Sequence, residues 1–213
     1  MRSLFYRLFS PAIINFEQNA CIFLSKYIQW STLPGRTLHF YIHMLKREKN
    51  ENELYRAAVR QRIASEDGSL FQNSNAERTQ IIVSEFLDAA TISAFILCGS
   101  LNKAVYEPLV ERFEDALNRG VDVRVIVLCE EGAVQSKTLA KLLKQRSALK
   151  FLPKIDMEIP HFAVFDGGLR YRIEQDPINK WAIVCACSKN NQNNYTIARG
   201  LEDVHSSLWN NYS

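Results

Sequence analysis

A short hydrophobic segment with ionisable residues at both ends is the part of this sequence best suited to chemistry. His161 precedes the apolar residues 162–165, and Asp166 follows them, directly before a Gly-Gly pair. An imidazole titrates near neutral pH, and a nearby carboxylate can orient it for proton transfer. Strands with buried-looking sequences rarely carry such groups, so this segment predicts a functional pocket.

The residues that follow add three charges with a spacing of two. Arg170, Arg172 and Glu174 fall on one face of a strand, because side chains alternate between the two faces. An arginine on this face could hold a phosphate or a carboxylate through two parallel hydrogen bonds. The alternative is a ladder of ion pairs on a solvated face, which contributes little stability. Both interpretations stay open from the sequence.

A polar turn after an earlier strand supplies two more candidate ligand-binding residues. Ser100 and Asn102 follow the apolar strand predicted over residues 93–98. They could line the same cleft as the hairpin. The favoured alternative is that they cap the helix that follows, since Ser and Asn side chains readily bond to nearby backbone groups.

The elements that must position these residues alternate between helix and strand. Periodicity and turn residues predict helices over 50–65, 76–89, 106–118, 136–145 and 196–209, and strands over 93–98, 121–128, 149–152, 161–174 (a hairpin) and 181–187. This alternation predicts an α/β fold with a mixed, largely parallel sheet and helices on both faces.

The first 49 residues differ from the remainder of the chain and form an atypical N-terminal extension. Residues 1–50 carry seven basic and two acidic residues, and apolar side chains recur at helical spacing. Three interpretations remain: a membrane-surface or partner-binding helix, a helix docked on the main domain, or a segment upstream of a start at Met44. Residues 50–75 are predicted as a helix and linker, and residues 76–213 as the α/β domain.

Composition limits the classes of function. The 213 residues carry a net charge of +3, and beyond residue 50 the chain holds 19 basic and 21 acidic residues. A near-neutral body gives no global electrostatic case for nucleic acid, so any such contact needs a local basic surface. One helix offers such a stripe with Lys137, Lys141, Lys144 and Arg146, although charged helix faces are usually just solvated.

The cysteines and the absence of a long apolar run indicate a cytoplasmic protein. Five cysteines, an odd number, show no disulfide framework, which fits a reducing compartment. Cys185 and Cys187 share a strand face, but no second cluster completes a metal site, so packing is the favoured interpretation. No run of about 18 apolar residues is present. The sequence predicts neither a metal nor a cofactor.

The order of elements over residues 76–213 resembles one half of the phospholipase D superfamily. The resemblance depends on a strand that ends in Gly-Ser-x-Asn at residues 99–102 and on the helix-to-strand junction Arg-Gly-Val-Asp-Val-Arg-Val-Ile-Val at Arg119–Val127. A closing helix over Ala198–Trp209 also looks like the terminal helix of the family. The resemblance implies a phospholipase D-like fold.

The signature of that family is His-x-Lys-x-x-x-x-Asp, and this chain carries a degenerate form of it. With Asp166 on the Asp position, His161 falls on the Lys position and Ile159 on that of the nucleophilic histidine. Isoleucine has no lone pair and cannot form a phospho-enzyme intermediate. Active members with one motif pair two chains, so the resemblance implies a homodimer with the hairpins near its axis.

The leading prediction is a non-catalytic binding module that recognises a phosphate-bearing ligand, a nucleic acid or a protein partner. The breadth of the family suggests a nucleic-acid-related or defence context. One alternative is a phosphodiesterase or nuclease that uses His161 with Asp166, Arg172 and Glu174. Another is a membrane-surface protein anchored by residues 1–30.

Overall fold

The computed structural model of this protein describes residues 50–152, 160–176 and 181–211. The predicted N-terminal extension, with its membrane and partner alternatives, lies outside the described residues, and so does Ile159. Among the helices that are described, none combines the length and the hydrophobicity that a membrane span requires.

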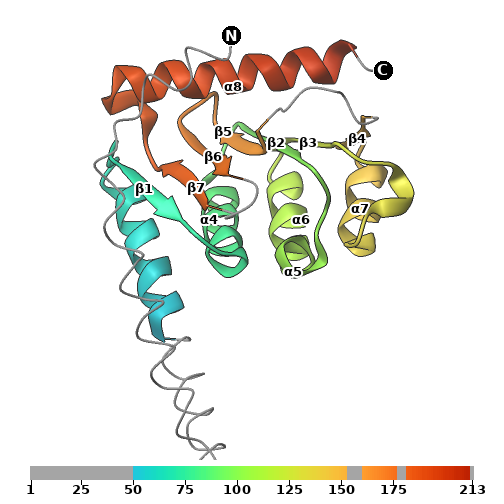
Figure 1. Cartoon of the computed structure of the whole chain (residues 1–213), viewed down its shortest axis with the longest axis horizontal. Helices are drawn as coiled ribbons and strands as arrows, with labels where there is room; N and C mark the ends of the chain where they lie inside the picture. Colours follow the sequence, from blue (N-terminus) through green and yellow to red (C-terminus); the bar gives the residue numbers. More distant parts are fainter. Residues whose placement is uncertain (1–49, 153–159, 177–180, 212–213) are drawn as a thin grey trace, which may run out of the picture. The chain divides into compact units, whose positions relative to one another are not determined.

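A single seven-stranded sheet forms the centre of the described region (Figure 1). The strands are β1 (Leu70–Asn73), β2 (Ser93–Cys98), β3 (Asp122–Val127), β4 (Leu149–Phe151), β5 (Phe162–Phe165), β6 (Arg170–Asp176) and β7 (Trp181–Cys185). Their order across the sheet is β1-β7-β6-β5-β2-β3-β4. The hairpin β5–β6 therefore lies in the middle of the sheet, beside β2.

The prediction of a mixed α/β fold is confirmed, but the prediction of a largely parallel sheet is wrong. Among the strand pairs of the described residues, β2–β3 and β3–β4 are parallel, and the other four are antiparallel. A parallel pair needs a long crossover, whereas β5 and β6 are joined by a tight turn. In this turn Asp166, Gly167 and Gly168 all have positive φ angles, of 51°, 66° and 85°.

The helices match the predicted positions with two differences. They cover residues 50–64, then α4 (Ala76–Ala89), α5 (Lys103–Tyr106), α6 (Val110–Asn118), α7 (Lys137–Gln145) and α8 (Gln192–Asn211). The helix predicted over 106–118 is interrupted by the 3-10 turn Glu107–Leu109, because Pro108 has no N–H for a continuous helix. Helix α8 begins at Gln192, earlier than the predicted start at residue 196.

Helices cover both faces of the sheet, and each face has its own hydrophobic core. Helix α8 covers one face, and helices α4, α6 and α7 lie on the other (Figure 1). Strand β2 shows the alternation: Phe95 and Leu97 belong to the core under α8, while Ile96 belongs to the core on the opposite side. All six residues of β2 are buried, which explains why this strand is apolar throughout.

His205 lies on the last helix, α8, and faces the interior of the protein. Its side chain is completely buried on the inner face of α8, where it stacks on Phe95 with ring centres 5.0 Å apart. Phe162 and Trp209 also contact the imidazole. Burial lowers the pKa of His205 to about 4, so this histidine is neutral at physiological pH.

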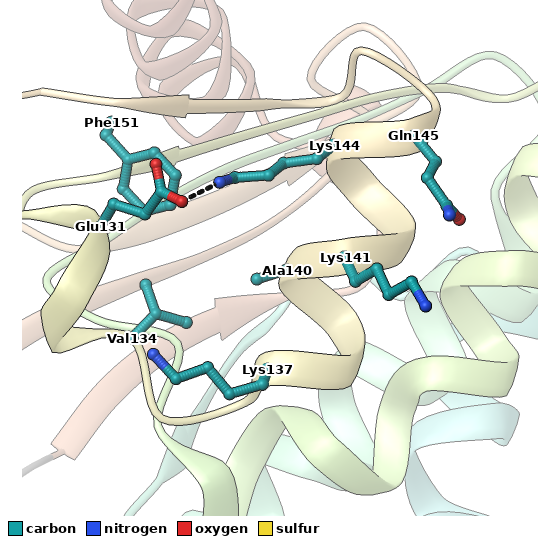
Figure 2. Close-up of a pocket in the computed structure, with 8 residues that line it drawn as sticks. All are labelled: Glu131, Val134, Lys137, Ala140, Lys141, Lys144, Gln145 and Phe151. Atoms are coloured by element: carbon teal, nitrogen blue, oxygen red, sulfur yellow. Dashed lines mark hydrogen bonds and ion pairs between the residues drawn. The ribbon is translucent and has the colours of Figure 1, made fainter.

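The predicted basic stripe lies on α7 and is exposed (Figure 2). Lys144 forms an ion pair with Glu131, which belongs to the 3-10 turn Glu131–Ala133 before the helix. Arg146 donates to Asn118 at the end of α6. These contacts orient part of the stripe, and the side chain of Lys141 points away from Glu131.

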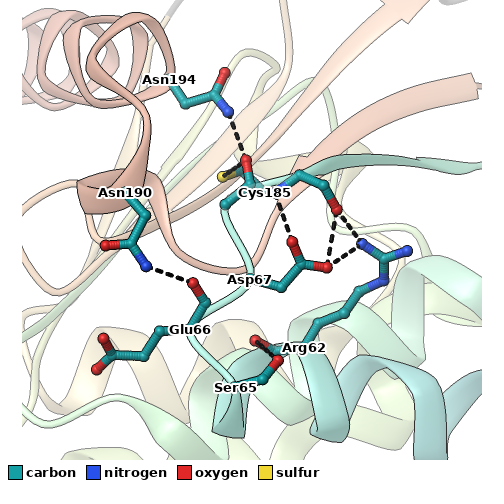
Figure 3. A network of polar contacts seen from close by, with 9 residues as sticks. Arg62, Ser65, Glu66, Asp67, Cys185, Asn190 and Asn194 are labelled. Carbon is teal, nitrogen blue, oxygen red and sulfur yellow. Dashed lines mark hydrogen bonds and ion pairs between the residues drawn. The ribbon is translucent and has the colours of Figure 1, made fainter.

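Residues 65–75, expected to belong to a helix and linker, include strand β1, which pairs with β7. Figure 3 shows how the preceding loop is held in place. Arg62 contacts the carboxylate of Asp67 at 2.7 Å. Asn194 on α8 donates to the carbonyl of Gly68 at 2.9 Å, and Asn190 donates to that of Glu66 at 2.7 Å. The loop thereby joins the first described helix to the start of α8.

Candidate functional site

A cavity of about 290 Å3 lies where β2 ends, β5 begins and α4 begins. Five of the seven predicted site residues line it, and they come from two separate parts of the chain: Ser100, Asn102, His161, Arg172 and Glu174. Its other lining residues include the first turn of α4 and Tyr106 of α5. The cavity is therefore the best candidate for a functional site.

The hairpin places His161 opposite Glu174. In the β5–β6 pairing, Phe162 is opposite Ile173, and the backbone N–H of Glu174 donates to the carbonyl of His161 at 2.8 Å. The side chains meet as well, since His161 Nδ1 lies 3.1 Å from Glu174 Oε2. The imidazole is about one third exposed, at 37%, and the carboxylate is more buried, at 16%. A carboxylate on Nδ1 orients the ring and directs Nε2 elsewhere.

Gly99 is what allows the His161 ring to sit where it does. A Cβ atom on residue 99 would lie 2.7 Å from His161 Nε2 and 2.8 Å from Cε1, closer than real contacts allow. The ring thus packs directly against the backbone at the end of β2. The sequence shows a Gly-Ser turn here, but not that its glycine faces an imidazole.

The strand β6 separates the charges from the apolar residues as its spacing predicts. Tyr171 and Ile173 belong to the core under α8, while Arg172 is opposite Ala163, which belongs to the core on the other face. Arg172 is 8% exposed, and its Nε has no hydrogen-bond partner among the described residues. A buried guanidinium donor without a partner is unfavourable, and an anion in the cavity would supply one.

Burial also sets the protonation of the groups around Arg172. It lowers the pKa of the guanidinium, an effect that Tyr106, Glu174 and Tyr55 oppose. It raises the pKa of Tyr106 well above its ordinary value and that of Cys98 to about 12. The phenol and the thiol are therefore neutral at physiological pH, and Arg172 keeps its positive charge because even a lowered arginine pKa stays high.

The beginning of α4 adds a second source of positive potential. Asn75 caps this 14-residue helix by accepting a hydrogen bond from the backbone N–H of Arg78 at 2.8 Å. Asn75, Ala76 and Thr79 all line the cavity. The N-terminus of a helix favours negative charge, because its first N–H groups and the helix dipole point toward the ligand.

The structure does not bring Asp166 and Arg170 to this cavity. Asp166 follows β5, whereas His161 precedes it, so the two lie at opposite ends of the strand. The backbone N–H groups of residues 91–93 donate to Asp166 Oδ1 at 2.9, 2.8 and 3.3 Å. Arg170 donates to Oδ2 at 2.6 Å. The Asp166 side chain is buried and that of Arg170 is 12% exposed; the Nε of Arg170 has no partner among the described residues but lies outside the cavity. This pair holds the β5–β6 turn against the start of β2.

The two polar residues after β2 lie beside the cavity with different contacts. The Asn102 side chain accepts a hydrogen bond from the backbone N–H of Ala104 at 2.8 Å, so it caps α5, as the favoured interpretation holds. Ser100 lines the cavity and is partly buried.

The described region offers no metal-ligating cluster of three or more His, Cys, Asp or Glu side chains. Cys185 and Cys187, the pair with a spacing of two, are both free thiols and buried. Cys185 belongs to the core under α8, in agreement with the packing interpretation.

Comparisons with known proteins address the fold. No protein-family model matches this chain, and no curated protein matches its sequence. Among solved structures, the chain is similar to TrmBL2, an archaeal chromatin protein that binds DNA, with 13% identity and a TM-score of 0.52. The match covers 88% of this chain and 67% of that one.

A second solved structure is Nuc from Salmonella typhimurium, a phospholipase D family member, with 12% identity and a TM-score of 0.45. That match covers 67% of this chain and 93% of Nuc. The similarity to TrmBL2 shows a related α/β fold, and at 13% identity it extends to the fold alone. The similarity to Nuc is too weak to carry an argument, so the phospholipase D resemblance stays a prediction.

Proposed function

We propose that this protein is a non-catalytic binding module with a phospholipase D-like fold, and that its cavity holds the phosphate group of a ligand. The observation that carries the proposal is Arg172, a buried guanidinium whose Nε has no partner among the described residues. Proteins tolerate such a group where a ligand completes its hydrogen bonds.

The surroundings of Arg172 support an anion with several acceptor oxygens. The first turn of α4 supplies positive potential, and Ser100 lines the cavity. Glu174 contacts the imidazole of His161 at 3.1 Å, and its negative charge interacts favourably with the guanidinium of Arg172. A cavity of about 290 Å3 has room for a phosphate group together with part of the molecule that carries it.

The comparisons support a phosphate ligand from the nucleotide class. TrmBL2, whose fold is similar, is a DNA-binding chromatin protein. Nucleotides and nucleic acids share the phosphate chemistry that Arg172 would recognise. We therefore expect a nucleoside monophosphate to bind more tightly than inorganic phosphate does.

Calorimetric titration with inorganic phosphate and with a nucleoside monophosphate tests the proposal. Arg172→Met should abolish binding, because it removes the charge and keeps the length of the side chain. Arg112→Met is the matched control, since Arg112 is exposed on α6 and forms an ion pair with Asp88 at 3.4 Å. Equal affinity in the wild type and in Arg172→Met would overturn the proposal.

The second candidate function is a phosphodiesterase or nuclease, and the His161–Glu174 contact favours it. A carboxylate on Nδ1 is how catalytic histidines are commonly oriented, with Nε2 as the reacting nitrogen. Asp166 has no part in this version, because its oxygens are occupied at the other end of β5. Cleavage of single- and double-stranded DNA, RNA and a generic phosphodiester, lost in His161→Ala, would establish an enzyme.

Two further proposals concern assembly. We expect a homodimer, from the resemblance to single-motif phospholipase D proteins, and light scattering on the full chain measures it; a monomer at all concentrations contradicts it. If residues 1–30 anchor the chain to membranes, a deletion of residues 1–43 should release it from anionic liposomes, and retained binding would exclude that anchor.

A further inference from the structure

A second cavity, of about 350 Å3, lies along α7, and it shares no lining residue with the Arg172 cavity. Its wall combines two kinds of side chain (Figure 2): the lysines Lys137, Lys141 and Lys144, and the apolar Val134, Ala140 and Phe151. We refer to this cavity as the α7 groove. Nothing in the proposed phosphate site explains its composition.

Basic residues outnumber acidic ones along the α7 groove. Residues 132–151 contain five Lys or Arg residues and no Asp or Glu. The three lysines have the spacing i, i+4 and i+7 and are all exposed, so they project from neighbouring turns of one helix. Glu131 is the acidic residue in the lining, and it is already paired with Lys144. Such a surface favours a polyanion.

An aromatic ring borders this basic surface, beside Lys144 (Figure 2). Phe151, on the edge strand β4, is partly buried, and Lys144 Nζ lies 5.3 Å from its ring centre. A basic groove that contains an aromatic face is typical of proteins that bind single strands, where bases stack on rings and lysines contact phosphates. We infer that the α7 groove binds single-stranded nucleic acid.

The residues that line the α7 groove fit a nucleic-acid duplex and a membrane surface less well than a single strand. A duplex presents mainly its phosphates to lysines, which would leave the apolar hollow around Phe151 unfilled. A membrane surface is also a poor fit. The large hydrophobic side chains that are exposed in the described region lie on other elements: Leu54, Leu70, Ile92, Tyr195 and Val204. The groove thus lacks an exposed apolar side chain to insert into lipid.

Fluorescence anisotropy with a labelled single-stranded oligonucleotide of mixed sequence tests the inference on the full chain. The double variant Lys137→Gln/Lys141→Gln should bind roughly 20-fold more weakly near 0.1 M salt, and the slope of log K against log salt should fall by about 1.4. The control Arg112→Gln/Lys189→Gln changes the net charge equally on other elements and should bind like the wild type.

Two further measurements distinguish the contribution of base stacking from that of the phosphate contacts. Phe151→Leu should weaken single-strand binding at least fivefold, since base stacking on a ring contributes about 1–3 kcal/mol. The matching duplex should bind more weakly than the single strand. The lysine and Phe151 variants leave the Arg172 cavity unchanged, so they should bind a nucleoside monophosphate like the wild type, and failure of the phosphate site and failure of the groove are told apart.

Three results would overturn the inference. One is an equal loss in the charge-matched control, which would indicate general attraction rather than a groove. Another is tighter binding of the duplex, or no effect of Phe151→Leu, which would leave only a backbone contact. The third is binding to anionic vesicles without binding to the oligonucleotide, which would point to a lipid surface.

Discussion

The two ends of the β5–β6 hairpin carry similar charges and use them differently. At the turn, both carboxylate oxygens of Asp166 are occupied by the backbone of residues 91–93 and by Arg170. At the open end, Arg172 is buried with a donor that has no partner in the described region, and the imidazole of His161 is partly exposed. A polar group whose hydrogen bonds are all made within the protein has a structural role. A group in a cavity that lacks a hydrogen-bond partner is available to a ligand.

The largest effect that tests this comparison should come from Asp166→Ala. The change removes the acceptor of three backbone N–H groups and leaves Arg170 buried without its counter-charge, so we expect the free energy of unfolding to fall by about 3–5 kcal/mol. Urea unfolding measures it. A loss below about 1 kcal/mol would contradict a structural role for this end of the hairpin.

The histidines extend the comparison, since His161 is partly exposed and His205 is buried. Because the pKa of His205 is lowered to about 4, the unfolded chain binds its proton more readily. Stability from this residue should be fully present above pH 6.5 and should decline as the pH falls toward 4, by roughly 3 kcal/mol at about 1.4 kcal/mol per pKa unit.

Thermal unfolding between pH 7 and pH 4 tests this prediction against a matched pair of variants. His205→Phe keeps a ring in the stack and removes the titrating group, so its stability should fall less with acid than that of the wild type. Val204→Ala, an exposed neighbour on α8 whose replacement removes no titrating group, should retain the full decline. Identical pH profiles for the wild type and His205→Phe would show that another group controls acid stability.

A smaller effect is expected at Gly99, where the open end of the hairpin meets β2. Gly99→Ala should displace the His161 ring and separate it from Glu174, with a loss of about 1 kcal/mol, because only a flexible side chain has to move. In Gly99→Ala/His161→Ala most of that loss should disappear. Additive losses in this double-mutant cycle would show that Gly99 is required by the local backbone conformation and not by the position of the His161 ring.

Asn102→Ala should separate capping from ligand binding at the same cavity. Loss of the bond to the Ala104 N–H should lower the free energy of unfolding by roughly 1 kcal/mol, which is typical of an N-cap. Phosphate affinity, measured by calorimetry, should change little. A large drop in affinity with unchanged stability would assign Asn102 to the ligand.

The smallest change in stability should come from Arg172→Met, which complements Asp166→Ala. A buried guanidinium with an unpaired donor contributes little to folding, so a methionine of similar length should leave stability within about 1 kcal/mol or raise it. Unfolding in urea without ligand measures this. A loss of several kcal/mol would show that Arg172 is already satisfied in the folded protein.

Much of the local structure followed from short-range pattern. Alternation along β6 placed Arg172 and Glu174 on one face and Tyr171 on the other, and the register agrees. The polar turn after β2 predicted a helix cap, and Asn102 caps the N-terminus of α5. Strand β1 was missed, since its four residues alternate weakly and it is ordered by pairing with β7.

The candidate site could be predicted only in part. The spacing of His161 and Asp166 resembled a family motif and placed both in one site, yet they lie at opposite ends of β5. Nothing in the sequence near Asp166 predicts that its carboxylate accepts hydrogen bonds from the N–H groups of residues 91–93, because those residues are more than seventy positions away. The unpaired Nε of Arg172 is likewise a property of its surroundings.

The sequence by itself determined the α/β class, the types of most elements, and which side chains share a strand face. Those properties depend on backbone geometry repeated every two or 3.6 residues, which neighbouring residues express. Only the tertiary structure decided that the sheet is mostly antiparallel, that His205 is buried, and that Asp166 is satisfied while Arg172 is not. Strand order and hydrogen-bond completion depend on contacts between distant segments, which no local pattern records.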